Sequence, residues 1–220
     1  RLWRKEAGFS FFRPFPAFPN PRICDILYPI GSVLTGERGM TEMAKPEAPV
    51  LETERLRLRR RQHRDIPRMM QAYQDDEIRR YLGGHPPKDG AMLAQLVRRR
   101  SPTEWAVTLR REDLYIGECT INRVVDGYLG ELGYLFLREY WGKGYAAEAA
   151  QAVLDYAAGK LRLGRMCACI DAANTRSVRL AERLGFERIA FLPEADFGGR
   201  VADMYYYARK LPGREWPLVP

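Results

Sequence analysis

The segment that most constrains the fold is a Gly-x-Gly turn that lies between an extended run and a helix-forming run. The extended run covers 130–136, the turn is Gly142-Lys143-Gly144, and an alanine-rich stretch that favours a helix begins at Tyr145. The first N–H groups of a helix have no partner within the helix, and glycine lets a ligand approach the backbone closely. The turn therefore predicts an anion site, most naturally for a phosphate, at the positive end of a helix dipole.

A second motif follows about thirty residues later and gives the turn a context. The sequence Asn-Thr-Arg-Ser at 174–177 opens a run that ends in Leu184-Gly185-Phe186. Together with the turn, this motif resembles the core of the GNAT acyltransferases, which move an acetyl group from acetyl-CoA to an amine. The segments 51–59 and 198–207 resemble the first and closing strands of the branch that includes the ribosomal-protein N-terminal acetyltransferases. The resemblance covers roughly residues 50–211.

The resemblance implies the GNAT acyl-CoA acyltransferase fold, an α+β fold with a central mixed, mostly antiparallel sheet flanked by about four helices. The hydrophobic periodicity along the chain is compatible with that fold. It predicts strands at 55–59, 105–109, 115–125, 128–137 and 165–171, a closing hairpin through Gly198-Gly199, and helices at 63–82, 89–99, from 144 onward and at 174–184. Asp126-Gly127 is typical of a hairpin turn.

The chain is long enough for one hydrophobic core, so we expect a single domain. Residues 49–212 form the predicted acetyltransferase domain, and 213–220 form a C-terminal tail. Residues 1–48 are rich in Phe and Pro without helical or strand periodicity, which indicates an N-terminal extension outside the core. Because Met40 and Met43 stand shortly before the family-like start, one hypothesis is that 1–39 is an upstream-translated or added segment, which the intact mass of the natively expressed protein tests.

The basic composition favours anionic partners without choosing among them. The net charge is +8 and the pI is near 9.5, and a CoA ester is itself polyanionic. Basic tracts interleaved with aromatic residues are not found, so we do not expect direct nucleic-acid recognition. No stretch is apolar for long enough to span a membrane, which indicates a cytoplasmic protein.

The four cysteines, Cys24, Cys119, Cys167 and Cys169, lack zinc-like spacing and indicate reduced thiols rather than a metal site. Alternation places Cys167 and Cys169 on one strand face, as a buried pair. The aromatic run 205–207 on the last strand suits an interface as well as a core, so a homodimer is compatible with the sequence.

In the family that the chain resembles, the pantetheine arm of CoA enters between two central strands and pairs with their backbone. The phosphates then rest on the turn. The resemblance implies that acetyl-CoA, the acetyl donor, binds to Leu135, Phe136, Leu137, Trp141, Gly142, Lys143, Gly144, Tyr145, Ala146 and Asn174. Trp141 departs from the Arg or Gln that is usual there, which matters little for a backbone site. Asn174 is equally a good helix N-cap.

An amine acceptor arrives as an ammonium ion and must lose a proton before it attacks. Glu131 is the predicted base, with an exposed strand carboxylate as the alternative interpretation and Glu118 as the second candidate. Glu148 suits the first turn of a helix. The family's usual tyrosine acid is replaced by Ala181. Ser177 is therefore the predicted general acid, which hydrogen-bonds the departing thiolate and gives it a proton, against the alternative of a polar first-turn residue.

These observations favour an acetyl-CoA-dependent N-acetyltransferase that works by direct attack in a ternary complex. The branch resemblance points to a protein N-terminus as the acceptor, followed by a small amine. The alternative is a non-catalytic CoA-binding or protein-interaction module with the same fold.

Overall fold

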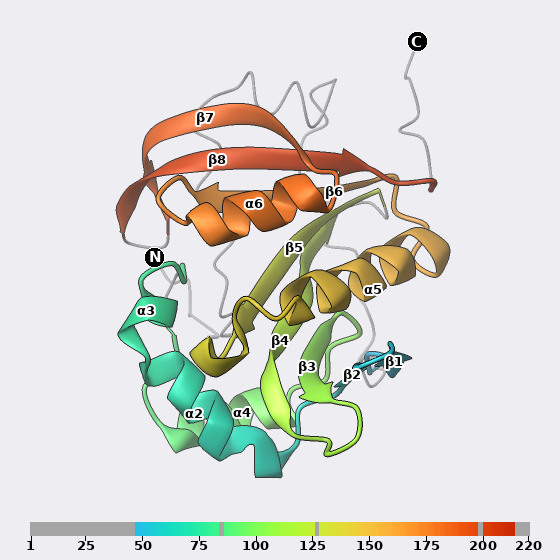
Figure 1. The fold of residues 1–220 in the computed structure, drawn as a ribbon, viewed down its shortest axis with the longest axis vertical. Coiled ribbons are helices and arrows are strands. Elements are labelled where there is room, and N and C mark those ends of the chain that lie inside the picture. Colours follow the sequence, from blue (N-terminus) through green and yellow to red (C-terminus); the bar gives the residue numbers. More distant parts are fainter. Residues whose placement is uncertain (1–46, 84–85, 126–127, 198–199, 214–220) are drawn as a thin grey trace, which may run out of the picture.

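The computed structural model describes residues 47–83, 86–125, 128–197 and 200–213. In these residues eight strands form one sheet, in the order β1-β2-β3-β4-β5-β6-β8-β7 (Figure 1). Every neighbouring pair is antiparallel except β5 and β6, which are parallel. The prediction of an α+β fold with a mixed, mostly antiparallel sheet is confirmed.

The elements follow the predicted order, with five α-helices and two short 3-10 helices in the described residues. The strands are β1 (Leu51–Glu52), β2 (Leu56–Arg59), β3 (Glu104–Leu109), β4 (Tyr115–Val125), β5 (Leu129–Phe136), β6 (Arg165–Asp171), β7 (Glu187–Asp196) and β8 (Val201–Lys210). The helices are η1 (His63–Asp65), α2 (Ile66–Gln74), α3 (Asp76–Arg79), α4 (Gly90–Arg98), η2 (Arg138–Tyr140), α5 (Tyr145–Gly159) and α6 (Thr175–Arg183). The predicted turns at 126–127 and 198–199 lie outside the described residues.

Two predicted elements are divided in the structure. The first strand, expected over 51–59, is broken by a turn in which the Thr53 N–H donates to the Leu56 carbonyl at 3.0 Å. The helix expected over 63–82 becomes η1, α2 and α3, because Asp75 adopts an extended conformation between α2 and α3. Its carboxylate accepts hydrogen bonds from the backbone N–H groups of Glu77 and Ile78, so this residue starts a new helix rather than continuing the old one.

Each face of the sheet buries its own set of apolar side chains. Trp105 and Val107 of β3 lie in a cluster with α5 and α6, whereas Ala106 between them lies in a cluster with α2 and α4. This is the period of two that a strand imposes. Figure 1 shows α5 and α6 over the same face of the sheet. We call this the donor face and the opposite one, which α2 and α4 cover, the acceptor face.

The core reaches slightly beyond the predicted domain boundary at 49. Ala48 is buried, and its N–H donates to the Ser101 carbonyl at 2.8 Å. Of the closing strand, Tyr206 and Tyr207 are buried within the chain's own core. None of the described helices has the length and apolar character that a membrane crossing requires.

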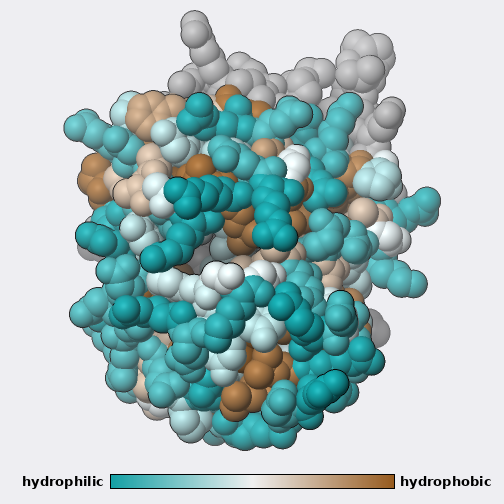
Figure 2. Space-filling model, in the orientation of Figure 1, coloured by the Kyte–Doolittle hydropathy of each residue, from teal (hydrophilic) through white to brown (hydrophobic). Residues whose placement is uncertain are grey.

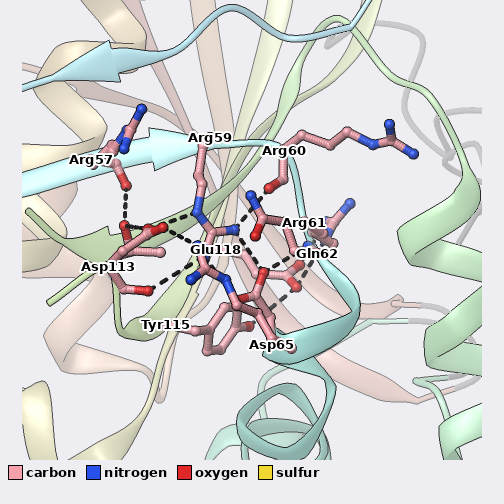
Figure 3. A network of polar contacts seen from close by, with 11 residues as sticks. Arg57, Arg59, Arg60, Arg61, Gln62, Asp65, Asp113, Tyr115 and Glu118 are labelled. Carbon is pink, nitrogen blue, oxygen red and sulfur yellow. Dashed lines mark hydrogen bonds and ion pairs between the residues drawn. The ribbon is translucent and has the colours of Figure 1, made fainter.

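The basic residue that ends β2 is not exposed, contrary to the simple alternation of apolar and basic residues. Arg59 is 4% exposed, since its guanidinium donates to Asp65 at 2.8 Å and to Asp113 at 2.7 Å (Figure 3). A buried guanidinium is tolerated where carboxylates satisfy it. Asp113 lies 54 positions away in sequence, so local alternation contains no sign of this partner.

Candidate active site

The parallel strands β5 and β6 separate after a short paired stretch. Their register runs from Leu129 opposite Arg165 to Glu131 opposite Cys167, although β5 continues to Phe136. A cavity of about 480 Å³ occupies the opening, with residues of both strands in its wall. Figure 2 shows the surface hollowed between α6 and the turn that leads into α5.

The backbone groups that face this opening belong to alternate residues of β5. The Leu137 N–H donates to the Ile116 carbonyl of the β4 side at 3.0 Å. Because hydrogen-bonded pairs alternate along antiparallel strands, Leu135 also directs its backbone groups toward β4, and those of Tyr134 and Phe136 face β6. The Phe136 carbonyl accepts a hydrogen bond from the Trp141 indole at 2.7 Å. Tyr134 therefore presents the backbone groups nearest the middle of the opening.

The Gly-x-Gly turn lies at one end of the cavity. Gly142 and Gly144 have φ values of 74° and 82°, in the left-handed region that glycine adopts without strain. Gly144 is the N-cap of α5, and no side chain caps this end. The N–H groups of Tyr145, Ala146 and Ala147 precede the first hydrogen bond of the helix, from Glu148 N–H to the Gly144 carbonyl, and these residues line the cavity. The geometry suits an anion that accepts several backbone hydrogen bonds.

Arginines of α6 add positive charge that the sequence analysis did not find. The guanidinium of Arg176 lies 4.5 Å from the centre of the Trp141 ring, and Arg176, Arg179 and Arg183 all line the cavity. Their spacing of three and four residues is the signal that would have placed them on one helix face. Lys143 is exposed and does not line the cavity; its ammonium nitrogen lies 5.5 Å from the centre of the Tyr140 ring.

Glu148 lies in the first turn of α5, close to the Gly-x-Gly turn. Its carboxylate is paired, so it does not present an uncompensated negative charge to an anion bound there. Its carboxylate accepts hydrogen bonds from the Thr53 hydroxyl at 2.6 Å and from the Arg55 N–H at 2.9 Å. Burial alone would raise the pKa of Glu148, but these bonds and the Arg55 charge lower it below its ordinary value. The carboxylate thus ties the segment before β2 to the helix.

Asn174 and Ser177 lie together at the start of α6. Asn174 is the N-cap of the helix, as expected, and its Oδ1 accepts from the Ser177 N–H at 3.2 Å. Both residues line the cavity, on the donor face. The Ser177 side chain lies beside Tyr134 of β5, and burial raises the pKa of the Tyr134 hydroxyl to about 12 while the serine partly opposes this rise.

Glu131 lies on the other side of the opening. Strand alternation separates it from Leu132 and Phe136, whose side chains pack on the donor face. Its carboxylate is half-buried, lines the cavity with Asn122 and lies close enough to Cys169 to add to the effect of burial, which raises the pKa of that thiol. Glu131 therefore lines the cavity from the face opposite the one that α5 and α6 cover.

Glu118, the second candidate base, belongs to a buried ion-pair network instead (Figure 3). It is 3% exposed, and its two oxygens accept from Arg61 at 2.9 and 2.7 Å. The hydroxyls of Tyr73 and Tyr115 donate to it as well, at 3.1 and 3.2 Å. Because both of its oxygens already accept hydrogen bonds and it does not line the cavity, Glu118 has a structural role.

The cavity thus brings together all of the predicted site residues except Leu137 and Lys143. Cys167 is buried and Cys169 is half-buried on the acceptor face, and neither forms a disulfide with another described cysteine. Among the described residues, no group of His, Cys, Asp and Glu side chains has the arrangement of a metal site.

Comparison with known proteins identifies relatives that span the same region. Residues 55–187 match the family described as Acetyltransferase (GNAT) domain. The chain is 30% identical over 167 residues to the uncharacterized N-acetyltransferase p20 of Bacillus licheniformis, a match that covers 72% of this chain and 94% of p20. A GNAT-family acetyltransferase from Bacillus anthracis has a similar crystal structure, with a TM-score of 0.68 and 26% identity over 74% of this chain and 98% of that one.

A spermidine N-acetyltransferase from Vibrio cholerae, solved with CoA and spermine, shares the fold. Its TM-score is 0.64 at 21% identity, over 73% of this chain and 98% of that one. The separated strands, the helix N-terminus beside them and these relatives define the class of the protein, an acyl-CoA-dependent N-acyltransferase. The chain belongs to the GNAT acetyltransferase family, whose co-substrate is acetyl-CoA.

Proposed function

We propose that the protein transfers the acetyl group of acetyl-CoA to a primary amine by direct attack in a ternary complex. The observation that carries the proposal is the cavity between β5 and β6, because it joins an anion site at the start of α5 to the unpaired part of a β-strand. The CoA pyrophosphate fits the N–H groups at the turn, and the pantetheine arm fits beside Tyr134 and Phe136, as an added strand would.

The two faces of the sheet contribute to different steps of the reaction. Glu131, on the acceptor face, takes a proton from the ammonium group, directly or through water. The free amine attacks the thioester carbonyl, and a backbone N–H in the strand opening stabilises the negative oxygen of the tetrahedral intermediate. Ser177, on the donor face, hydrogen-bonds the departing thiolate.

The acceptor is a protein N-terminus or a small amine. The branch resemblance of the first and last strands favours the N-terminus, whereas the fold shared with a spermidine N-acetyltransferase supports a small polyamine. Glu77 of α3 lines the cavity with Glu131, so two carboxylates border the acceptor entrance. Either acceptor is cationic before it reacts, and both suit such an entrance.

Release of CoA thiol from acetyl-CoA over a panel of acceptors tests the proposal. The panel contains peptides with free and blocked N-termini, spermidine, amino acids and aminoglycosides. We expect sustained turnover with one class, and a loss of kcat of about a hundredfold or more in Glu131→Gln, the range for a removed general base. Glu139→Gln is the matched control, because Glu139 is exposed and its carboxylate pairs with Arg68.

Two outcomes would contradict the proposal. Full turnover by Glu131→Gln would remove Glu131 from the mechanism. Binding of CoA without turnover on any acceptor would favour a non-catalytic CoA-binding module.

A further inference from the structure

One buried hydroxyl in the cavity wall has no assigned role in the mechanism above. The Tyr134 oxygen is inaccessible to solvent. The Ser177 side chain lies beside it but does not form a hydrogen bond of ordinary geometry with it, and neither does any other residue in the described part of the chain. A buried polar group without a partner typically costs about 1–3 kcal/mol. Such a group in the wall of a ligand cavity therefore indicates a partner that arrives with the ligand.

The side chain of Tyr134 is on the face where the donor binds. Leu132 and Phe136, two positions before and after it, pack with α5 and α6, and Tyr134 packs against the same cluster. Ser177 of α6 is its neighbour. Glu131 lies three positions earlier in the strand and so points to the opposite face. A thioester held in the opening has the tyrosine on its sulfur side and the carboxylate on its amine side.

We propose that the Tyr134 hydroxyl donates a hydrogen bond to the sulfur of CoA, as a second donor beside Ser177, and stabilises the thiolate as it leaves. The C–N bond forms and the C–S bond breaks, with the bonding electrons of the latter passing to sulfur. Of the three ammonium protons, one passes to Glu131, a second passes to solvent and the third stays on the amide nitrogen. The thiolate takes up a proton from solvent on release. This inference rests on the proposed acetyl transfer.

The acidity of the two groups determines what the hydroxyl can do. Burial raises the pKa of Tyr134 to about 12, whereas an ordinary thiol has a pKa of about 8.5. The phenol therefore keeps its proton beside a thiolate and acts by hydrogen bonding. Hydrogen bonds to charged acceptors are stronger than those to neutral ones, so the bond strengthens as charge develops on sulfur.

The test compares CoA with desulfo-CoA, which lacks the sulfur, by calorimetric binding at about pH 9.5, where an ordinary thiol is mostly ionised. In the wild type we expect CoA to bind more tightly than desulfo-CoA. In Tyr134→Phe that preference should fall about tenfold or more, the effect expected for a hydrogen bond to a charged group. In turnover, kcat should fall about tenfold to a hundredfold while KM for acetyl-CoA changes little.

Tyr156→Phe is the matched control. Tyr156 is a half-buried tyrosine of α5 whose ring packs edge-on against Trp105 at 5.4 Å between centroids, and it does not line the cavity. Its removal should leave the preference for CoA unchanged. Ser177→Ala separates the contribution of the serine from that of the tyrosine.

An unchanged preference in Tyr134→Phe would overturn the inference, and so would equal affinities of the wild type for the two ligands, a result that needs no variant to fold. Neither result requires turnover. If the wild type binds no CoA, or turns over no acceptor, the proposed function fails instead, so the two failures are distinguishable.

Discussion

Replacing Glu118 by glutamine tests whether this carboxylate holds the fold together or takes part in the reaction. Glu118 joins β4 to the segment before α2 through Arg61, which is 8% exposed and also pairs with Glu104 at 2.6 Å. Burial opposes the charge on Arg61, but Glu118 and Glu104 raise its pKa well above the ordinary value, so the guanidinium stays charged. Glutamine keeps the shape of the side chain and changes one acceptor oxygen into a donor.

The magnitude follows from the contacts that this change removes. Each Glu118 oxygen accepts one bond from Arg61 and one from a tyrosine hydroxyl. Whichever oxygen becomes the amide nitrogen, one charge-assisted bond is lost, worth about 1.5–3 kcal/mol, and one buried N–H of Arg61 faces another donor, which costs about 1 kcal/mol or more. The tyrosine on that side can rotate to accept instead. We expect a loss of about 3 kcal/mol in the free energy of unfolding.

Urea unfolding of the ligand-free protein, followed by tryptophan fluorescence, measures this loss. In a domain of this size about 3 kcal/mol corresponds to a Tm lower by roughly 6–12 °C. The control is Glu139→Gln, since Glu139 forms an exposed pair with Arg68 and exposed pairs contribute about 0–1 kcal/mol. A Glu118→Gln variant within about 1 kcal/mol of the wild type would refute the reasoning. If its kcat also collapsed at unchanged stability, Glu118 would be a base after all.

Three further predictions concern the donor site and its supports. Gly144→Ala and Gly142→Ala each place a side chain at positive φ and should each cost about 1–2 kcal/mol of stability. A Cβ at Gly142 meets nothing within 4 Å, whereas a Cβ at Gly144 comes within 3.3 Å of the Arg55 guanidinium. Thermal melts should therefore show the larger loss of stability for Gly144→Ala, and equal losses would contradict this. Because the folded-state pKa of Glu148 is lowered, its carboxylate stabilises the protein above about pH 4.5, and this contribution is lost as pH falls through the folded pKa. The difference in stability between the wild type and Glu148→Gln should therefore vanish in acid. A difference that stays constant with pH would contradict this prediction. Arg179→Gln should weaken CoA binding up to about fivefold at low salt without affecting acetyl-pantetheine, which has no phosphates, and an equal loss for both would place Arg179 elsewhere.

The parts of the site that the sequence predicted are those that depend on local signals. Gly142 and Gly144 have a positive φ that their residue type favours, and Asn174 caps the helix that follows it. These features need only a few neighbouring residues. Their arrival in one cavity was implied by the family resemblance, because periodicity alone does not bring 144 and 174 together.

The parts that the sequence did not predict depend on distant partners. Arg59 is buried because Asp113 faces it across the fold, and Glu118 is occupied because Arg61 reaches it. A basic strand residue and a strand carboxylate look the same in sequence whether they are paired or exposed. The helix break at Asp75 has a local signal, a good N-cap, but the amphipathic pattern continued across it and outweighed that signal.

The strand register determines which way the Tyr134 side chain points, although neither of the two sequence motifs includes this residue. In β5 the backbone groups of a residue point toward a neighbouring strand, whereas its side chain points to one face of the sheet. The backbone groups of Tyr134 and Phe136 face the opening, because the pairing of Leu137 with Ile116 fixes the parity of the strand. The side chains of Glu131 and Tyr134 are three positions apart and therefore lie on opposite faces of the strand. The parity decides which of the two faces each side chain occupies. A slip of β5 by one residue against β4 would exchange the faces, so the separation of an acceptor-side carboxylate from a sulfur-side hydroxyl depends on the same hydrogen bonds that hold the sheet together.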